Sequence, residues 1–136
     1  MYIGMGANTV AKLMVELEPP IMMICADAAI PKGTVLKLST PYTVAASAAD
    51  NDLFGGIAAE EKISGDGKLM IAVYRRGIFK VEAGAGGVTV GLPVGIVALN
   101  NFKNTTANDN DLGYNFGRAL ETAADTQFFL MELGGC

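Results

Sequence analysis

The sequence of 136 residues contains no histidine and no tryptophan. The absence of histidine removes the commonest general base and the commonest metal ligand. A serine or cysteine nucleophile would then need an unusual activating partner, such as lysine. We therefore expect a protein that is not an enzyme, with no catalytic residue, no bound metal and no cofactor.

Cysteine is also scarce, because Cys25 and Cys136 are the only two. Two cysteines do not make a disulfide framework. Cys25 lies in the apolar run 21–26 and is expected to be a buried thiol. The nearest charge is Asp27, which would raise the pKa of that thiol and leave it unreactive.

Charged residues make up only 18% of the chain, and 10 Lys and Arg face 14 Asp and Glu for a net charge of −4. The basic residues are scattered, whereas nucleic-acid binding needs a basic stripe, so no nucleic acid is expected as a partner. No run approaches the ~18 apolar residues of a membrane helix, so no membrane partner is expected either. Residues 1–20 lack the pattern of a secretion signal, which favours synthesis in the cytoplasm.

What the chain does have is apolar surface: 51% of its residues are hydrophobic, and the mean hydropathy is +0.35. Without a membrane span, this surplus has to be covered in another way. Association with other chains is the simplest cover. The composition thus predicts an oligomer or a component of a larger assembly.

The surplus is concentrated in the stretch 52–82, which reads as two strands around a turn at Gly65-Asp66-Gly67, followed by a third strand. Residues 68–74 (KLMIAVY) are apolar at both alternating sets of positions. A strand of this kind is covered on both faces, and in so short a chain we expect the second cover to come from another subunit. Arg75 and Arg76 follow and point to opposite faces; they are either a solvated strand end or a source of one interface arginine.

Short apolar segments separated by turn signals recur along the rest of the chain and predict an all-β fold, a small barrel or sandwich. We divide it into an N-terminal arm, residues 1–20, with a short helix or strand over 10–17, and a single β domain, residues 21–136. Residues 83–87 are expected to be a flexible connector, and residues 100–114 a long polar loop. The expected strands are 21–26, 34–38, 41–46, 88–90, 94–99, 117–121 and 127–133.

Two acidic segments could carry chemistry. Residues 108–113 alternate side-chain oxygens as calcium loops do, but the glycine is one position early for an EF-hand and Leu120 stands where the bidentate glutamate would be. An ordinary surface loop fits better. Glu60-Glu61, next to Lys62, fits a solvated edge better than a pair for acid–base catalysis.

Several segments, taken in order, resemble the capsid-decorating (cement) proteins of tailed bacteriophages. The segment LFGGIAAE (53–60), followed by a turn, an apolar strand and RGIFKV (76–81), is similar to the small head-stabilising proteins of lambda-like phages. The segments IPKGTVL (30–36), VGLPV (90–94) and FGRALE (116–121) are similar to cement proteins with a β-tulip fold. The likeness covers roughly residues 28–133.

The resemblance implies a structural protein of the virion, located on the capsid exterior. It would bind the major capsid protein of an expanded icosahedral head as a homotrimer at local threefold axes and stabilise that head. Residues of the arm would contact the capsid: Tyr2, Ile3, Met5, Val10, Leu13 and Met14. We place the subunit interface at Tyr74, Arg76, Phe79, Phe128 and Phe129.

A second interpretation remains open, namely a β-barrel module that binds carbohydrate or a receptor on a virion or cell surface. The segment IPKGTVL also occurs in unrelated β-clip domains and does not separate the two. Sugar-binding sites usually expose aromatic rings, and a chain with no Trp and 4 Tyr offers few of them.

Overall fold

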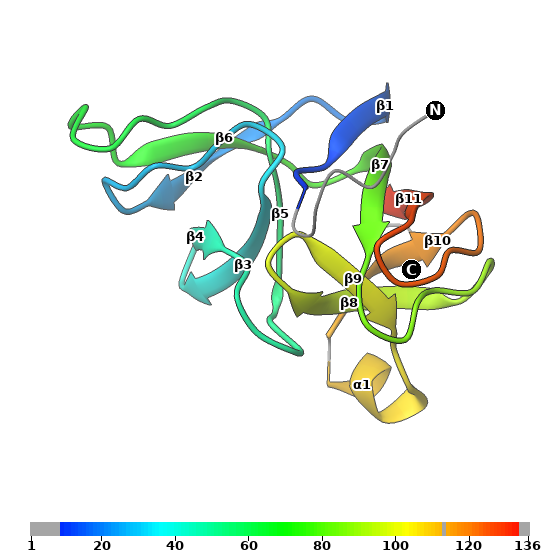
Figure 1. Ribbon diagram of the computed structural model, residues 1–136. Coiled ribbons are helices and arrows are strands. Elements are labelled where there is room, and N and C mark those ends of the chain that lie inside the picture. Colours follow the sequence, from blue (N-terminus) through cyan, green and yellow to red (C-terminus); the bar gives the residue numbers. More distant parts are fainter. Residues whose placement is uncertain (1–8, 113, 134–136) are drawn as a thin grey trace.

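The computed structural model describes residues 9–112 and 114–133. These residues form strands β1 to β11 and one short helix, α1. The strands build two small five-stranded barrels that lie side by side (Figure 1). The predicted all-β barrel fold is therefore confirmed.

The first barrel contains the C-terminal half of the chain. Its strands follow the order β7 (Gly77–Ala83), β11 (Phe128–Leu133), β10 (Asn115–Ala119), β8 (Pro93–Ala98) and β9 (Asn101–Asn104). The barrel closes because β9 pairs in parallel with the end of β7. Strand β1 (Lys12–Glu16) pairs in antiparallel fashion with the beginning of β7.

The second barrel is formed by residues between β1 and β7. Its order is β2 (Ile21–Cys25), β4 (Thr43–Ala46), β3 (Val35–Thr40), β5 (Phe54–Ala58) and β6 (Met70–Tyr74). Strands β2 and β6 are antiparallel neighbours and close this barrel. They extend away from the rest of the molecule in Figure 1.

The two barrels share strands between their cores. Successive side chains of a strand point to opposite sides, so Val35 of β3 and Ile57 of β5 are buried in the first core. Their neighbours Leu36 and Ala58 are buried in the second core. Because both strands serve both cores, the barrels form one continuous packed unit.

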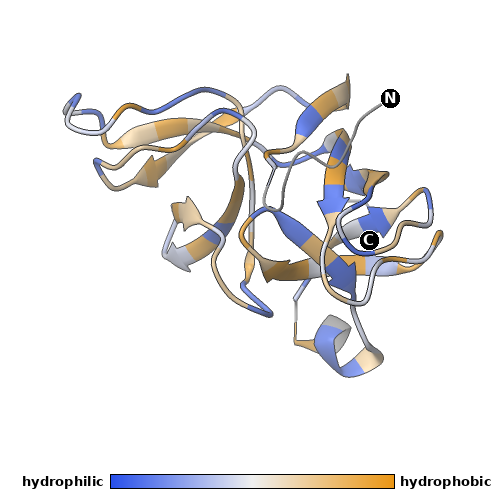
Figure 2. Ribbon diagram, viewed as in Figure 1, coloured by the Kyte–Doolittle hydropathy of each residue, from blue (hydrophilic) through white to orange (hydrophobic). Residues whose placement is uncertain are grey.

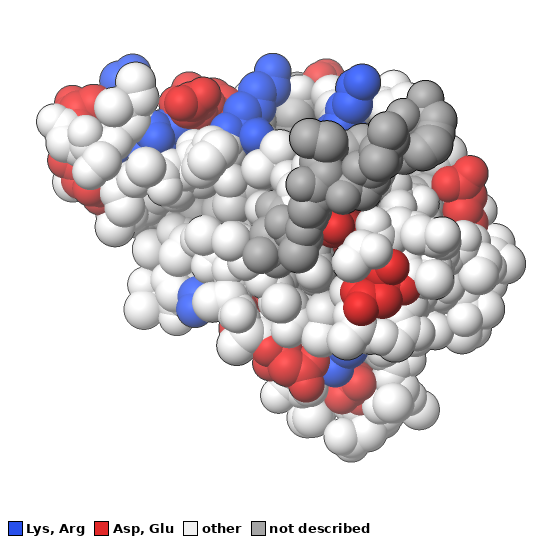
Figure 3. All heavy atoms as spheres, viewed as in Figure 1, with Lys and Arg blue, Asp and Glu red and all other residues white. Residues whose placement is uncertain are grey.

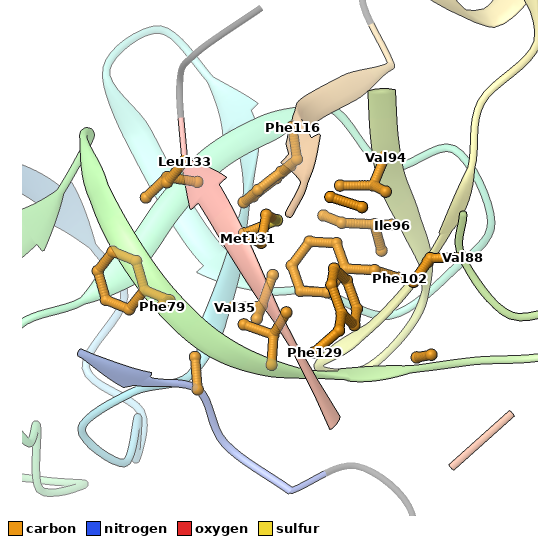
Figure 4. Packing of buried hydrophobic residues seen from close by; sticks show 14 of the residues in the cluster. Val35, Phe79, Val88, Val94, Ile96, Phe102, Phe116, Phe129, Met131 and Leu133 are labelled. Atoms are coloured by element: carbon orange, nitrogen blue, oxygen red, sulfur yellow. The ribbon is translucent and has the colours of Figure 1, made fainter. Parts of the chain in front are cut away.

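Aromatic rings fill much of the first core (Figure 4). Phe102 makes edge-to-face contacts with Phe116 and Phe129, at centroid distances of 5.4 and 6.3 Å, and Phe54 lies 4.4 Å from Phe116. Such contacts stabilise a core beyond the area that they bury. In β11 the burial alternates: Phe129, Met131 and Leu133 are fully buried, whereas Phe128, Leu130 and Glu132 are partly exposed.

The structure corrects two local expectations and decides between the two alternatives given for residues 10–17. Residues 100–114 are not one polar loop, because they contain β9 and α1 (Ala107–Asp111), and Phe102 is fully buried. The expected flexible connector is a tight turn in which Gly84 and Gly87 are buried and Gly87 donates a hydrogen bond to the Gly84 carbonyl. Residues 10–17 contain a strand and no helix.

Candidate assembly surfaces

The outer face of the β2–β6 strand pair is apolar and uncovered. Met22 lies opposite Ala72, and Ile24 opposite Met70, and these residues alternate with the buried pair Met23 and Ile71. Ile24 and Met70 are each 41% exposed. Figure 2 shows hydrophobic colour along both strands although they extend away from the barrels. The second apolar face predicted for residues 68–74 is therefore present, and within the described chain nothing covers it.

We call residues 21–29 and 60–72 the finger: they comprise β2, the start of β6 and the loops at their ends. Its loops carry two large apolar side chains that point into solvent, Ile63 and Leu69, which are 64% and 58% exposed. Carboxylates outnumber lysines there. Figure 3 shows acidic and basic side chains at the left end and along the upper left edge of the molecule. The carboxylates are Asp27, Glu60, Glu61 and Asp66, and the lysines are Lys62 and Lys68.

A buried ammonium group fixes the finger loops. Lys62 is 3% exposed, and its Nζ lies 2.7 Å from Asp27 Oδ1 and 2.5 Å from Asp66 Oδ1. The Asp27 carboxylate also accepts hydrogen bonds from the backbone amides of Gly65 and Gly67. Both glycines have positive φ, at 80° and 79°, which side chains other than glycine adopt at a cost. One carboxylate thus holds the turn predicted at this position.

The charges of this triad stabilise one another. The hydrogen bond from Lys62 lowers the pKa values of both Asp27 and Asp66, and backbone amides add to the effect. Burial lowers the pKa of Lys62, but the two carboxylates raise it by more, and the net shift is upward. All three groups are therefore charged at neutral pH, and the loop is held in one conformation.

The second candidate surface is a pocket of about 760 Å³ between β1 and the junction of the two barrels. Its apolar wall includes Leu13, Ile57, Tyr74, Phe79 and Phe128. Three lysines, Lys12, Lys32 and Lys80, also line it, and we call it the lysine pocket. None of these lysines forms an ion pair with another described residue, and no carboxylate belongs to the described lining. The pocket is thus an apolar hollow with an uncompensated positive rim.

Backbone contacts at the start of the described chain give the pocket its shape. The Ala11 amide donates to the Gly33 carbonyl at 2.8 Å, and a Cβ atom at Gly33 would lie 2.3 Å from the Ala11 carbonyl oxygen. The Thr9 amide donates to Oε1 of Glu82, which is fully buried. Residues 9–16 are therefore built onto the barrels.

Tyr74 stands at the end of β6, where the finger strands reach the pocket. Its ring makes an edge-to-face contact with Phe79 at 5.6 Å, and its hydroxyl donates to Glu16 at 3.4 Å. Burial and the nearby Glu16 carboxylate both raise the pKa of this hydroxyl, which is neutral at physiological pH.

The residues expected to contact a capsid fall into two groups. Tyr2, Ile3 and Met5 lie outside the described residues. Of the others, Val10 and Leu13 line the lysine pocket, and Met14 is 50% exposed at a bulge of β1.

The residues expected at a subunit interface also fall into two groups, buried and at least partly exposed. Phe79 and Phe129 are buried in the first core of the single chain. Phe129 has no exposed surface, so the interface role expected of it is corrected to a core role. Phe79 packs in the same core at 1% exposure and borders the lysine pocket. Tyr74 and Phe128 are partly buried in the lysine pocket, and Arg76 is exposed.

Arg75, which precedes Arg76, has a structural role within the chain. The Arg75 guanidinium lies 4.2 Å from the centre of the Phe54 ring and donates to the Gly55 carbonyl at 3.2 Å. Burial lowers its pKa. Arg75 and Arg76 lie in the bend between β6 and β7, and only Arg76 is left facing solvent.

The residues considered for chemistry are placed as follows. Cys25 is buried, and burial raises the pKa of its thiol. Glu60 accepts a hydrogen bond from the Ala72 amide and so fixes the edge of β6. Among the described residues no group of His, Cys, Asp or Glu could hold a metal ion, and no helix is long and apolar enough to cross a membrane.

Two features were missed by the sequence reasoning. The lysine pocket joins residues that are far apart in the chain, and only the pairing of β1 with β7 brings Lys12 to Lys80. The triad had a partial signal, because Lys62 and Asp66 are four residues apart. Nothing in the sequence indicated that Asp27 would join them.

The architecture is therefore that of a double-barrel β protein with an apolar finger and a lysine-lined pocket. No protein-family model and no curated protein matches the sequence. Among solved structures, the crystal structure of the head fiber gp8.5 N base of bacteriophage phi29 is similar, with a TM-score of 0.54 and 18% sequence identity. The similarity covers 84% of this chain and 92% of that one.

At this level of identity the likeness concerns the fold. The similarity to phage head proteins inferred from the sequence is confirmed to that extent, since a head-associated phage protein has the same architecture.

Proposed function

We propose that this protein is a structural component of a phage virion that decorates the outside of the expanded head, as a homotrimer at local threefold axes, and stabilises it. The observation that carries the proposal is the fold shared with the phi29 head fiber base over 84% of the chain. It acts by binding the major capsid protein, without catalysis. A protein that binds the expanded lattice alone stabilises that state by mass action.

The surface of the chain supports an assembly role. The finger exposes Met22, Ile24 and Met70 on its outer face and Ile63 and Leu69 in its loops, and exposed apolar surface of this kind marks interaction sites. The neighbouring strand β1 exposes Met14 and Val15. We assign the capsid contact to the outer side of β1, where Met14 is exposed, and the subunit contact to the surface around Tyr74, Arg76 and Phe128. Val10 and Leu13, which were also expected to contact the capsid, line the lysine pocket.

Co-sedimentation with heads tests the proposal. Purified protein is mixed at micromolar concentration with undecorated expanded heads and, separately, with unexpanded heads of the phage that carries the gene, and the copies per pelleted shell are counted. We expect saturable binding to expanded heads, with a copy number per shell that is a multiple of three, and no binding to unexpanded heads. Protein that stays in the supernatant with expanded heads contradicts the proposed function.

A point variant tests the contact region. Deleting the whole arm would be ambiguous, because Ala11 is buried and β1 is paired. Met14→Ser removes an exposed apolar side chain and should weaken head binding while leaving the urea midpoint unchanged. Val90→Ser, at a comparable exposure of 54% in the turn before β8, is the matched control. Equal head binding by both variants would remove β1 from the contact.

A further inference from the structure

The finger and the lysine pocket complement each other in charge and in hydrophobicity. The finger presents Ile63 and Leu69 among carboxylates, and the pocket presents an apolar wall among Lys12, Lys32 and Lys80. We propose that the finger of one copy inserts into the lysine pocket of the next copy, so that the subunits join head to tail and close into a ring. This inference rests on the proposed homotrimer and names its interface.

The placement of the two surfaces requires such a head-to-tail contact. The finger loops precede β6 at Met70, and the pocket takes Tyr74 from the other end of the same strand. The two surfaces therefore lie at opposite ends of β6 and differ from each other (Figure 1). Two different patches that meet between copies form a heterologous interface, which generates a ring when the rotation closes.

Electrostatics favour this occupant of the pocket. Lys12 and Lys80 stand directly opposite each other on β1 and β7, where like charges oppose strand pairing. No described carboxylate compensates them or Lys32 within the chain. An acidic segment of another copy would relieve this repulsion. The finger is such a segment, and it also carries the apolar side chains of Ile63 and Leu69.

The finger is also rigid before it binds. Lys62 and its two carboxylates fix the loop, and Asp27 holds the two glycine amides. A preorganised element loses less conformational entropy on association than a flexible one. The backbone of the loop that carries Ile63 is consequently held in place before the finger reaches the pocket.

The pocket is large enough for this occupant. Its volume of about 760 Å³ lies within the range of ~300–1,000 Å³ that is typical of pockets for small ligands, which is enough for two aliphatic side chains. Tyr74 in its wall gives the apolar side chains a contact surface, while the lysines at the rim meet Glu61 and the neighbouring carboxylates. Buried aromatic residues at the centre and charges at the rim are the usual arrangement of an interface.

A mixing experiment with full-length variants tests the contact. The pocket variant carries Lys32→Glu and Lys80→Glu, and the finger variant carries Ile63→Ser and Leu69→Ser. Molar masses are measured by light scattering during size-exclusion chromatography, for each variant alone and for an equimolar mixture. We expect a trimer for the unmodified protein, a monomer for each variant alone, and a heterodimer for the mixture.

The heterodimer is the decisive species, because the mixture contains one intact finger and one intact pocket on different chains. Lys68→Glu is the charge control: it reverses one exposed lysine of the finger, as each of the two pocket substitutions does in the pocket, and should leave the trimer intact. High salt should dissociate the trimer, since a Debye length of about 3 Å at 1 M screens the lysine rim.

Other outcomes overturn the inference, the proposed function, or one without the other. Variants that remain trimeric exclude this contact, and a pocket variant that stays trimeric but no longer binds heads shows that a segment of the shell occupies the pocket. Unmodified protein that is monomeric and still binds heads excludes the ring but leaves the proposed function standing. A trimer that dissociates and recombines as expected, but does not bind heads, supports the inference and contradicts the proposed function.

Discussion

Lys12 and Lys80 are directly opposite each other in the antiparallel pairing of β1 with β7. Two ammonium groups at such positions repel each other, and neither has an ion-pair partner among the described residues. The pair therefore costs the isolated chain some stability. A cost of this kind at an exposed position is understandable when the charges serve an interaction with another molecule.

Removing one of these charges should stabilise the monomer. We expect Lys80→Gln to raise the free energy of unfolding by about 0.2–1 kcal/mol, the range of cross-strand charge effects. Urea unfolding of the variant in the Ile63→Ser/Leu69→Ser background measures this without a contribution from assembly. The control is Lys37→Gln, because Lys37 stands opposite the uncharged Ala45. A loss of stability in Lys80→Gln would show that the lysine makes a favourable contact within the chain.

The triad in the finger should respond asymmetrically to substitution. The double variant Asp27→Asn/Asp66→Asn leaves the buried Lys62 ammonium without a carboxylate. Lys62→Met removes that buried charge and leaves two carboxylates that water can reach, since they are about a quarter to a third exposed. An uncompensated buried charge is the more costly defect. We therefore expect a lower urea midpoint for the double variant than for Lys62→Met, and the reverse order would contradict this account.

The same triad predicts a pH dependence of stability. The pKa values of Asp27 and Asp66 are lowered in the folded chain, so the unfolded chain takes up protons first as the pH falls below about 4. The stabilisation is present above that range and is lost as the pH falls through the lowered values. The pKa of Lys62 is raised, so its contribution is complete below 10.5 and is lost as the pH rises through the higher folded value.

Urea unfolding between pH 7 and pH 2.5 measures the acid limb. The unmodified chain should lose more stability over this interval than the Asp27→Asn/Asp66→Asn variant does. Asp125→Asn, which changes an exposed aspartate in the turn before β11, is the control and should follow the unmodified chain. Parallel curves for the unmodified chain and the double variant would show that the two carboxylates do not couple to folding.

The local pattern of the sequence predicted the strands well, because alternation is a property of neighbouring residues. In residues 128–133 the two alternating sets that the sequence predicts are observed in β11: Phe129, Met131 and Leu133 are buried, and the residues between them are partly exposed. In 68–74 it indicated a second apolar face, which the structure places at Met70 and Ala72 on the outside of the finger. The surplus of apolar residues and its position were therefore predictable.

The candidate surfaces were less predictable, because they depend on the register between distant strands. Lys12 and Lys80 meet only through the pairing of β1 with β7. Phe79 was expected at an interface, yet the strand register places its side chain in the first core. A single sequence shows that a strand has two apolar faces and does not show which face the fold covers.

The composition of 100–114 was misleading, and Phe102 offers a test of the corrected assignment. Its ring is fully buried between Phe116 and Phe129, so Phe102→Ala leaves a large cavity in the first core. We expect a loss of about 3–5 kcal/mol in the free energy of unfolding. Leu112→Ala, in the same segment at a residue that is 55% exposed, should change it by no more than about 0.5 kcal/mol. Urea denaturation, monitored by circular dichroism, distinguishes the two variants. If both lowered the free energy of unfolding equally and slightly, residues 100–114 would be a surface loop after all.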